Sequence, residues 1–292
     1  MVLQKEILYA LLGHTGQIVD GSFYLAPGLP LVDASERALL TRLLALGRFY
    51  RDLEAFVSAS SSASPYLLAF ALGLEECLQP YRARVLELEQ TLIRTPDLSL
   101  AALQLGFGDF ELTLPALHRL VGAVEHADLR GVSLLDHLHA SAAGCVHSLR
   151  ASLRVLLRHT QRVLRSQLAA WLLHGELLPG DGDFFVERAR KASTDSTETD
   201  AEHADDDVLG GGWFAFDVSV TRKPAFLPMR VAERILFIGK AVRVLRASER
   251  RREIEAVKTP SSYGVGGALL LPPSPDSLLS PLTDVSILDG RP

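Results

Sequence analysis

The segment from His147 to His174 constrains the fold of this chain more than any other, because two opposite side-chain patterns run along it. The apolar residues on one side are Leu149, Leu153, Leu156, Leu157, Val163, Leu164 and Trp171. The arginines between them, at steps of four, four, four and three, are Arg150, Arg154, Arg158, Arg162 and Arg165, here called the Arg row. At 100° per residue the Arg row occupies an arc of about 120° on the opposite side of a helix. Burying the apolar side chains is worth about 10 kcal/mol, whereas an exposed arginine pair contributes about 0–1 kcal/mol. The segment therefore predicts an amphipathic helix whose apolar face packs into a larger helical structure.

Most of the first 247 residues repeat this helical spacing, and leucine and alanine, which favour helices, dominate the sequence. The predicted helices cover residues 2–12, 33–56, 65–93, 97–105, 109–121, 131–144, 147–174 and 229–246. Residues 213–221 instead alternate apolar and polar side chains, as a strand does. We therefore predict an all-α fold of antiparallel helical bundles stacked end to end, with one short β segment at residues 213–221.

Local signals indicate several helix ends. Asp33 stands three residues before Glu36, the arrangement of a capping box. Thr95 and Pro96 suit the cap and the first turn of the helix that follows them. Pro80 lies within a predicted helix, where it removes a backbone hydrogen bond and predicts a kink or a join.

Two segments lack a core-forming pattern. Residues 192–212 carry seven acidic residues and no Lys or Arg, which predicts an acidic, flexible loop inside the domain. Residues 248–292 become rich in Pro, Gly and Ser after a charged start, which predicts a low-complexity, disordered tail. The remaining pattern predicts one helical domain at residues 1–247.

Composition argues against several classes of protein. The net charge of −5 gives no general reason to expect binding to nucleic acid or to an acidic membrane. Cys77 and Cys145 form no CxxC pair, which argues against a disulfide scaffold or a Cys-based zinc site. The N-terminus lacks a signal-peptide pattern, and the chain lacks an apolar run of about 18 residues that could cross a bilayer. We expect a cytoplasmic protein with no nucleic acid and no membrane partner.

The stretch LLHGELLPGDG around His174 has two interpretations. His174 and Glu176 could form an acid–base pair that shuttles a proton. Alternatively, Gly175 suits the left-handed position that ends a helix, and a charged His174 would interact favourably with the last carbonyl groups. Neither a local nucleophile motif nor an HExxH arrangement accompanies the pair, so we predict a helix end and no enzymatic activity.

The other histidines give no metal-site pattern. His137 and His139 lie two residues apart, so a helix points them to different sides. His137 could share a site with Asp136 or His147, but a third and a fourth ligand are missing at metal spacing. The glycines of residues 248–292 do not match the GxGxxG spacing, and GxxxxGK[ST] is absent. We expect no catalytic residue, no metal and no cofactor.

The Arg row remains the candidate functional surface, with two interpretations open. It can be the solvated face of an amphipathic helix. It can also be a docking surface for an acidic partner, or for the chain's own acidic loop at residues 195–207. A generic helical adaptor would use the Arg row to bind an acidic peptide, with a steep dependence on salt.

Several segments resemble the gamma-tubulin complex component family and follow one another in the same order as in that family. The stretch YLLAFALGLEECLQPYRARVLELEQTLI resembles the family's helix that leads through LQPYR into a helix rich in Leu and Glu. The stretch SQLAAWLLHGELLPGDGDFFV resembles QLxxWxxxGxLxDxxxEFFI, with Gly182-Asp183 where a carboxylate precedes the Phe pair. The stretch LPMRVAERILFIGKAV is similar to PxxIPxxxAExILFxGKxV. The beginning, EILYALLGHTGQIV, is most similar to the smallest component of the set, the fourth.

The resemblance covers residues 3 to about 247 and implies an all-α stack of helical bundles, the N-terminal or first Grip domain. It implies that such domains lie side by side in neighbouring components, in an array that holds gamma-tubulin in a ring and templates microtubules. The implied partners are other gamma-tubulin complex components, through lateral contacts between N-terminal domains, and gamma-tubulin through the full-length family architecture. The implied location is the cytoplasm and cytoskeleton, at microtubule-organising centres, centrosomes and spindle poles.

In this family the gamma-tubulin-binding surface belongs to the second Grip domain, and the resemblance stops after about Arg246. Direct gamma-tubulin binding is therefore not implied for this chain. We expect the sequence to be a truncated gene model, a splice variant or a fragment.

Overall fold

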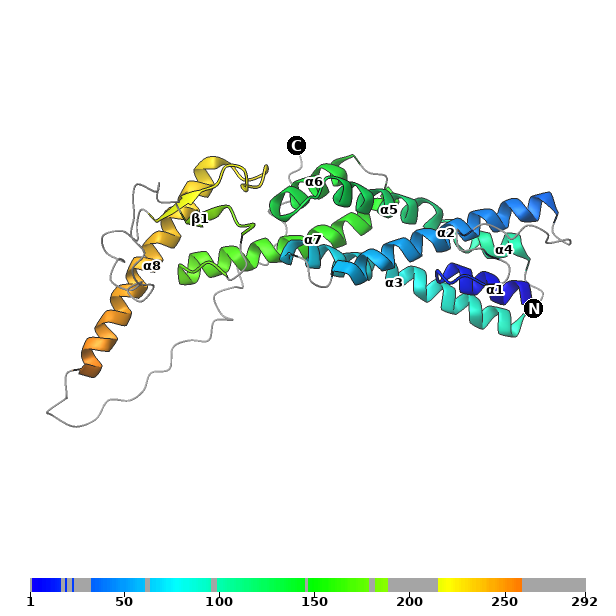
Figure 1. Ribbon diagram of the computed structural model, residues 1–292, viewed down its shortest axis with the longest axis horizontal. Coiled ribbons are helices and arrows are strands. Elements are labelled where there is room, and N and C mark those ends of the chain that lie inside the picture. The colour runs from blue at the N-terminus through cyan, green and yellow to red at the C-terminus, as the bar shows by residue number, and fades with distance from the viewer. Residues whose placement is uncertain are drawn as a thin grey trace, which may run out of the picture. The chain divides into compact units, whose positions relative to one another are not determined.

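The computed structural model describes residues 2–16, 19, 23, 33–60, 64–95, 99–144, 147–178, 182–188 and 215–258. Its elements are α1 (Val2–Leu11), α2 (Ala34–Ala59), α3 (Pro65–Arg94), α4 (Leu100–Leu105), α5 (Phe110–His126), α6 (Gly131–Ala143), α7 (His147–Ala169), the π-helical turn η2 (Ala170–His174), β1 (Val186–Arg188), β2 (Phe216–Val218) and α8 (Met229–Lys258). Apart from one pair of short strands, the described residues are helical or lie in connecting segments, which confirms the all-α prediction (Figure 1). The chain divides into two units, Met1–Ser248 and Glu249–Pro292, and the apolar core of the described residues lies in the first.

The two long helices α3 and α7 pack extensively against each other in this first unit. Near the start of α3, the Tyr66 hydroxyl donates a hydrogen bond to Gln167 Oε1 at 2.8 Å. One third of the way along α3, the Cys77 thiol donates to the Ser152 carbonyl at 3.5 Å. Moving forward along α3 therefore moves backward along α7, and the two helices are antiparallel. Helix α6 packs against both, and α2 packs against α1, α3 and α5.

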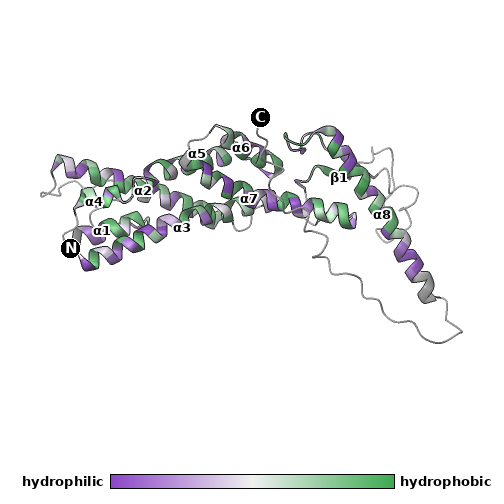
Figure 2. Cartoon of the chain, turned by 180° about the vertical axis from the view of Figure 1, so that it is seen from behind, coloured by the Kyte–Doolittle hydropathy of each residue, from purple (hydrophilic) through white to green (hydrophobic). Residues whose placement is uncertain are grey.

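The apolar core continues from α1 to α8, and its largest side chains are aromatic. The largest fully buried side chains include Trp171, Tyr66, Tyr81, Phe70, Phe107, Phe184 and Phe185. Tyr81 shows how one of them joins several elements: its hydroxyl donates to the Leu11 carbonyl at 2.8 Å, and its ring meets Phe107 and Phe110 edge-on. Figure 2 shows apolar and polar residues interleaved along the helices, as amphipathic helices that pack on a shared core require.

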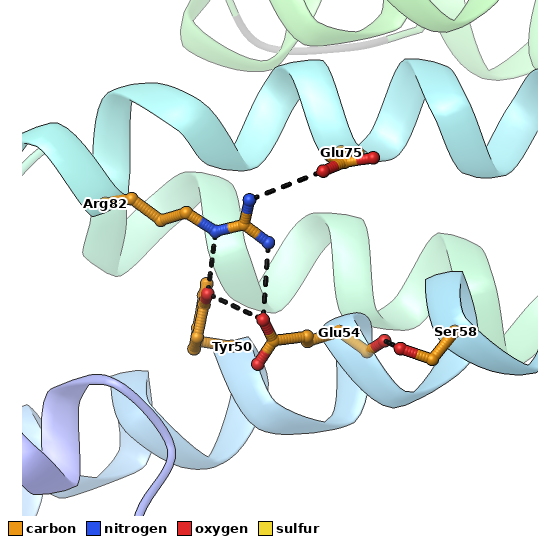
Figure 3. A network of polar contacts seen from close by, with 5 residues as sticks. All are labelled: Tyr50, Glu54, Ser58, Glu75 and Arg82. Atoms are coloured by element: carbon orange, nitrogen blue, oxygen red, sulfur yellow. Dashed lines mark hydrogen bonds and ion pairs between the residues drawn. The ribbon is translucent and has the colours of Figure 1, made fainter.

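A polar network joins α2 to α3 at the margin of this core (Figure 3). Arg82 Nε donates to the Tyr50 hydroxyl at 2.8 Å, and its guanidinium also pairs with Glu54 at 3.3 Å and with Glu75 at 3.6 Å. The Tyr50 hydroxyl donates in turn to Glu54 at 3.1 Å, and Ser58 Oγ donates to the Glu54 carbonyl at 3.0 Å. Burial raises the pKa of Tyr50, so the phenol keeps the proton that it donates.

Two predicted caps are wrong in detail. Helix α2 begins directly after Asp33, as expected, but the Asp33 side chain makes no capping hydrogen bond. Helix α4 begins after Ser99, whose hydroxyl accepts the N–H of Ala102 at 3.3 Å. Thr95 instead ends α3, and its N–H donates to the Thr91 carbonyl. A serine hydroxyl next to the first turn satisfies an N–H that Thr95, further upstream, does not reach.

Of the kink or join predicted at Pro80, the join is wrong, because α3 is one helix from Pro65 to Arg94. Leu78 and Tyr81, on either side of Pro80, are fully buried. Tertiary packing of these neighbours outweighs the single backbone hydrogen bond that a proline removes.

The β segment predicted at residues 213–221 contains β2, which pairs antiparallel with β1 so that Val186 lies opposite Val218. Helix α8 continues to Lys258, into the segment predicted as tail, because residues 249–258 are mostly charged residues that favour helix. The predicted acidic loop at residues 192–212 and the tail after residue 258 lie outside the described residues. No helix among the described residues is long and apolar enough to span a bilayer.

Candidate partner-docking site

Helix α7 and the turn η2 place the Arg row by burying the opposite side of the helix. Leu153, Leu156 and Trp171 expose at most 1% of their surface. Two polar residues, Thr160 and Gln167, are buried on the same side; Thr160 donates to the Leu156 carbonyl, and Gln167 accepts from α3. All members of the Arg row are exposed. The predicted amphipathic helix is therefore confirmed, while its docking role stays a hypothesis.

The middle of the Arg row holds a carboxylate supplied by α3. Arg158 forms an ion pair with Glu76, and His159 Nε2 lies 2.7 Å from the other oxygen of the same carboxylate. Hydrogen bonds from His159 and then from Arg158 lower the pKa of Glu76, so this carboxylate stays ionised. The Glu76 and Arg158 side chains keep 46% and 61% of their surface exposed, so the pair is open to solvent. Sequence reasoning missed this pair, because Glu76 and Arg158 are 82 residues apart.

The other four members of the Arg row make no hydrogen bond or ion pair within the described part of the chain. Successive members one turn apart are separated by about 6 Å along the helix, and the row extends for about 22 Å. A line of positive charge of this length lies on a chain whose net charge is −5, so its positive potential is local. Chemically, it is suited to carboxylates or phosphates.

The structure places His174 and Glu176 at a helix end, as predicted. Gly175 has φ 66° and ψ 22°, the left-handed conformation, and its N–H donates to the Trp171 carbonyl at 2.9 Å. Its own carbonyl accepts from Arg243 of α8 at 3.3 Å. His174 and Glu176 therefore belong to the end of the α7–η2 helix, which is joined there to α8.

His139 and Asp136 of α6 contact the segment that holds Ala225 and Phe226. The His139 ring lies 4.9 Å from the Phe226 ring, and burial lowers the pKa of His139. Asp136 accepts the backbone N–H of Ala225 at 3.0 Å. Among the described residues, no three possible ligands gather into a metal site; the His147 side chain and the glycines of the tail lie outside them.

Sequence reasoning also missed a tight joint between η2 and α8. The indole N–H of Trp171 donates to the Ile235 carbonyl at 3.0 Å, and the indole ring lies directly against the backbone of Gly239. Phe216 of β2 packs on the same indole at 5.1 Å. The sequence did contain an indication of this contact, because the family's QLxxW and ILFxGK patterns specify a Trp at position 171 and a Gly at position 239.

Comparison with known proteins tests the resemblance. The family model described as gamma tubulin complex component N-terminal matches residues 5–278. The chain belongs to the gamma-tubulin complex component family. The match extends beyond Arg246, where the resemblance was expected to stop.

The relatives bear the name of component 4, in line with the similarity seen at the start of the chain. The chain is 33% identical over 282 residues to the gamma-tubulin complex component 4 homolog of Medicago truncatula, covering 82% of this chain and 38% of that relative. It is 30% identical to gamma-tubulin complex component 4 of Arabidopsis thaliana, covering 82% and 40%. For the component 4 of Mus musculus the identity is 27%, covering 82% and 42%. The chain therefore spans about two-fifths of the length of these relatives.

Proposed function

We propose that this chain is a structural component of the gamma-tubulin complex, whose N-terminal Grip-type domain packs side by side with those of neighbouring components. In this proposal the array supports microtubule nucleation at microtubule-organising centres and spindle poles in the cytoplasm. Gamma-tubulin is held through the architecture of the full-length family members. The observation that carries the proposal is the family match over residues 5–278.

The exposed Arg row supports this proposal as one of the lateral contact surfaces. Packed helix faces give an interface its shape, and charges near it fix register and exclude wrong partners. Four arginines that make no hydrogen bond or ion pair within the described part of the chain are available for that role. Their helix is held rigidly, because its other side is buried against α3 and α6.

The test is a charge reversal at the centre of the row, Arg154→Glu combined with Arg158→Glu. The variant and the wild-type chain would each be co-expressed with the N-terminal domains of other gamma-tubulin complex components from one species. We expect capture of a neighbouring domain to fall about tenfold or more, since like charges would then face the partner. Far-UV circular dichroism should stay unchanged.

A matched control reverses two exposed arginines outside the row, Arg37→Glu with Arg119→Glu, and changes the net charge equally. Capture that is unaffected by the row variant would overturn the Arg row as a lateral surface. The four arginines that have no partner among the described residues also favour a second candidate, a generic helical adaptor for acidic peptides. That function would appear as binding to an isolated acidic peptide with a steep salt dependence, without any need for a folded homologous domain.

A further inference from the structure

The structure itself shows one ligand that the Arg row accepts. Glu76 reaches across from α3 and places one carboxylate oxygen on Arg158 and the other on His159. Nothing local in α3 dictates this contact, since the two partners of Glu76 belong to an antiparallel helix. The centre of the row is therefore a carboxylate site that is already filled from within the chain.

Within the part of the chain that the structure describes, the positions on either side of this site have no carboxylate partner. Arg154 and Arg162 lie one helical turn before and after Arg158, at about 6 Å along the axis. Arg150 and Arg165 continue the line at its two ends. In the part of the chain that the structure describes, none of these four arginines has a carboxylate partner. Among the described residues, therefore, one arginine of the row has a carboxylate partner and four have none.

The spacing of these arginines favours a helical partner. Carboxylates at steps of four on a second helix repeat at the same distance of about 6 Å, so two helices laid side by side stay in register from Arg150 to Arg162. A charge-assisted contact between guanidinium and carboxylate is among the stronger hydrogen bonds available to such a surface. The net charge of −5 disfavours a nucleic acid as the alternative source of anions.

We infer that the Arg row binds a helix of a neighbouring component's N-terminal domain that carries carboxylates one turn apart, and that Glu76 competes with this helix for Arg158. The inference rests on the lateral assembly proposed for this domain and names the chemistry of the partner. The competition predicts the direction of a change in affinity: removing the acidic Glu76 from this chain should strengthen its complex with the partner domain. Damage to the fold would produce the opposite result.

The experiment measures binding of the full chain to fluorescently labelled N-terminal domains of gamma-tubulin complex components from one species, by fluorescence anisotropy at low and at moderate salt. Glu76→Ala removes both the charge and the hydrogen-bond acceptor, and should tighten binding about two- to fivefold, the range set by one exposed ion pair. Glu76→Gln should lie between Glu76→Ala and wild type, because its amide oxygen still accepts from Arg158. The gain should shrink at higher salt.

Glu87→Gln is the matched control, since Glu87 lies on the same helix, is exposed and pairs with Arg84 of α3 rather than with α7. It should bind like wild type. If Glu76→Ala and Glu76→Gln bind no more tightly than wild type while Arg154→Glu still weakens capture, Glu76 does not compete and lateral assembly stands. If no domain is captured and no variant changes this, both proposals are wrong. A gain of affinity confined to a short DNA duplex would show a phosphate surface and also overturn the inference.

Discussion

The joint between η2 and α8 makes Gly239→Ala the sharpest test of the packing around Trp171. A Cβ at position 239 would lie 2.1 Å from two atoms of the Trp171 indole, Cε2 and Nε1, and 2.6 Å from a third. Carbon atoms do not approach so closely, so the ring has to move. Trp171 is fully buried, so the ring moves against packed neighbours, and its hydrogen bond to Ile235 would break.

The magnitude is the sum of three contributions. Overpacking of a well-packed core costs about 1–3 kcal/mol, and loss of the indole hydrogen bond costs about 1 kcal/mol more. Alanine in place of glycine within a helix stabilises the folded state by about 1 kcal/mol. We therefore expect Gly239→Ala to lower the free energy of unfolding by about 1–3 kcal/mol. For a chain of this size that corresponds to a fall in Tm of roughly 2–12 °C.

Urea unfolding followed by circular dichroism measures this change, and Trp171 emission in a Trp213→Phe background reports on the joint itself. A displaced indole should emit at longer wavelength in the Gly239→Ala variant before unfolding begins. Gly122→Ala is the matched control: Gly122 lies within α5, and no atom lies within 4 Å of where its Cβ would be. The control should be more stable by up to about 1 kcal/mol. If Gly239→Ala is as stable as Gly122→Ala, with unchanged emission, the indole does not pack against Gly239.

Two further predictions concern α3. Pro80→Ala should raise the free energy of unfolding by about 1–3 kcal/mol in urea, because it restores a backbone hydrogen bond within a continuous helix; a loss of stability would contradict the continuity of α3. Burial raises the pKa of the Cys77 thiol to about 12, so the folded chain keeps it protonated and unreactive near neutral pH. In a Cys145→Ser background, a thiol reagent should therefore modify Cys77 about a hundredfold or more slowly than in denaturant, and similar rates in the two conditions would refute its burial.

The parts of the fold that could be predicted from the sequence are those decided within a few residues. The period of α7 predicted which of its sides would be buried. Gly175 has the left-handed conformation that its place after His174 indicated, and α6 ends at Gly144 as expected. The wrong details depend on distant contacts instead. Local sequence left a kink or a join open at Pro80, because single-residue rules do not include the tertiary packing of Tyr81 within the continuous helix α3.

The candidate site also has features that local sequence predicts and features that depend on tertiary packing. Exposure of the Arg row follows from helical spacing alone, so five residue positions sufficed to predict it. The carboxylate of Glu76 at the centre of the row could not be predicted, because its position depends on how α3 lies against α7. The strand β1 was missed for a related reason: three residues carry too little pattern, and their partner β2 comes later in the chain.

The hydrogen bond between Tyr66 and Gln167 joins residues that are 101 positions apart, and this has a consequence during synthesis. The inner side of α3 has no α7 to cover it until the ribosome has made those later residues. At about 5–20 residues per second, the wait lasts about 5–20 seconds. Throughout that interval the nascent chain presents a long leucine- and tyrosine-rich surface to solvent, so we expect its yield in cells to depend on chaperones that bind such surfaces.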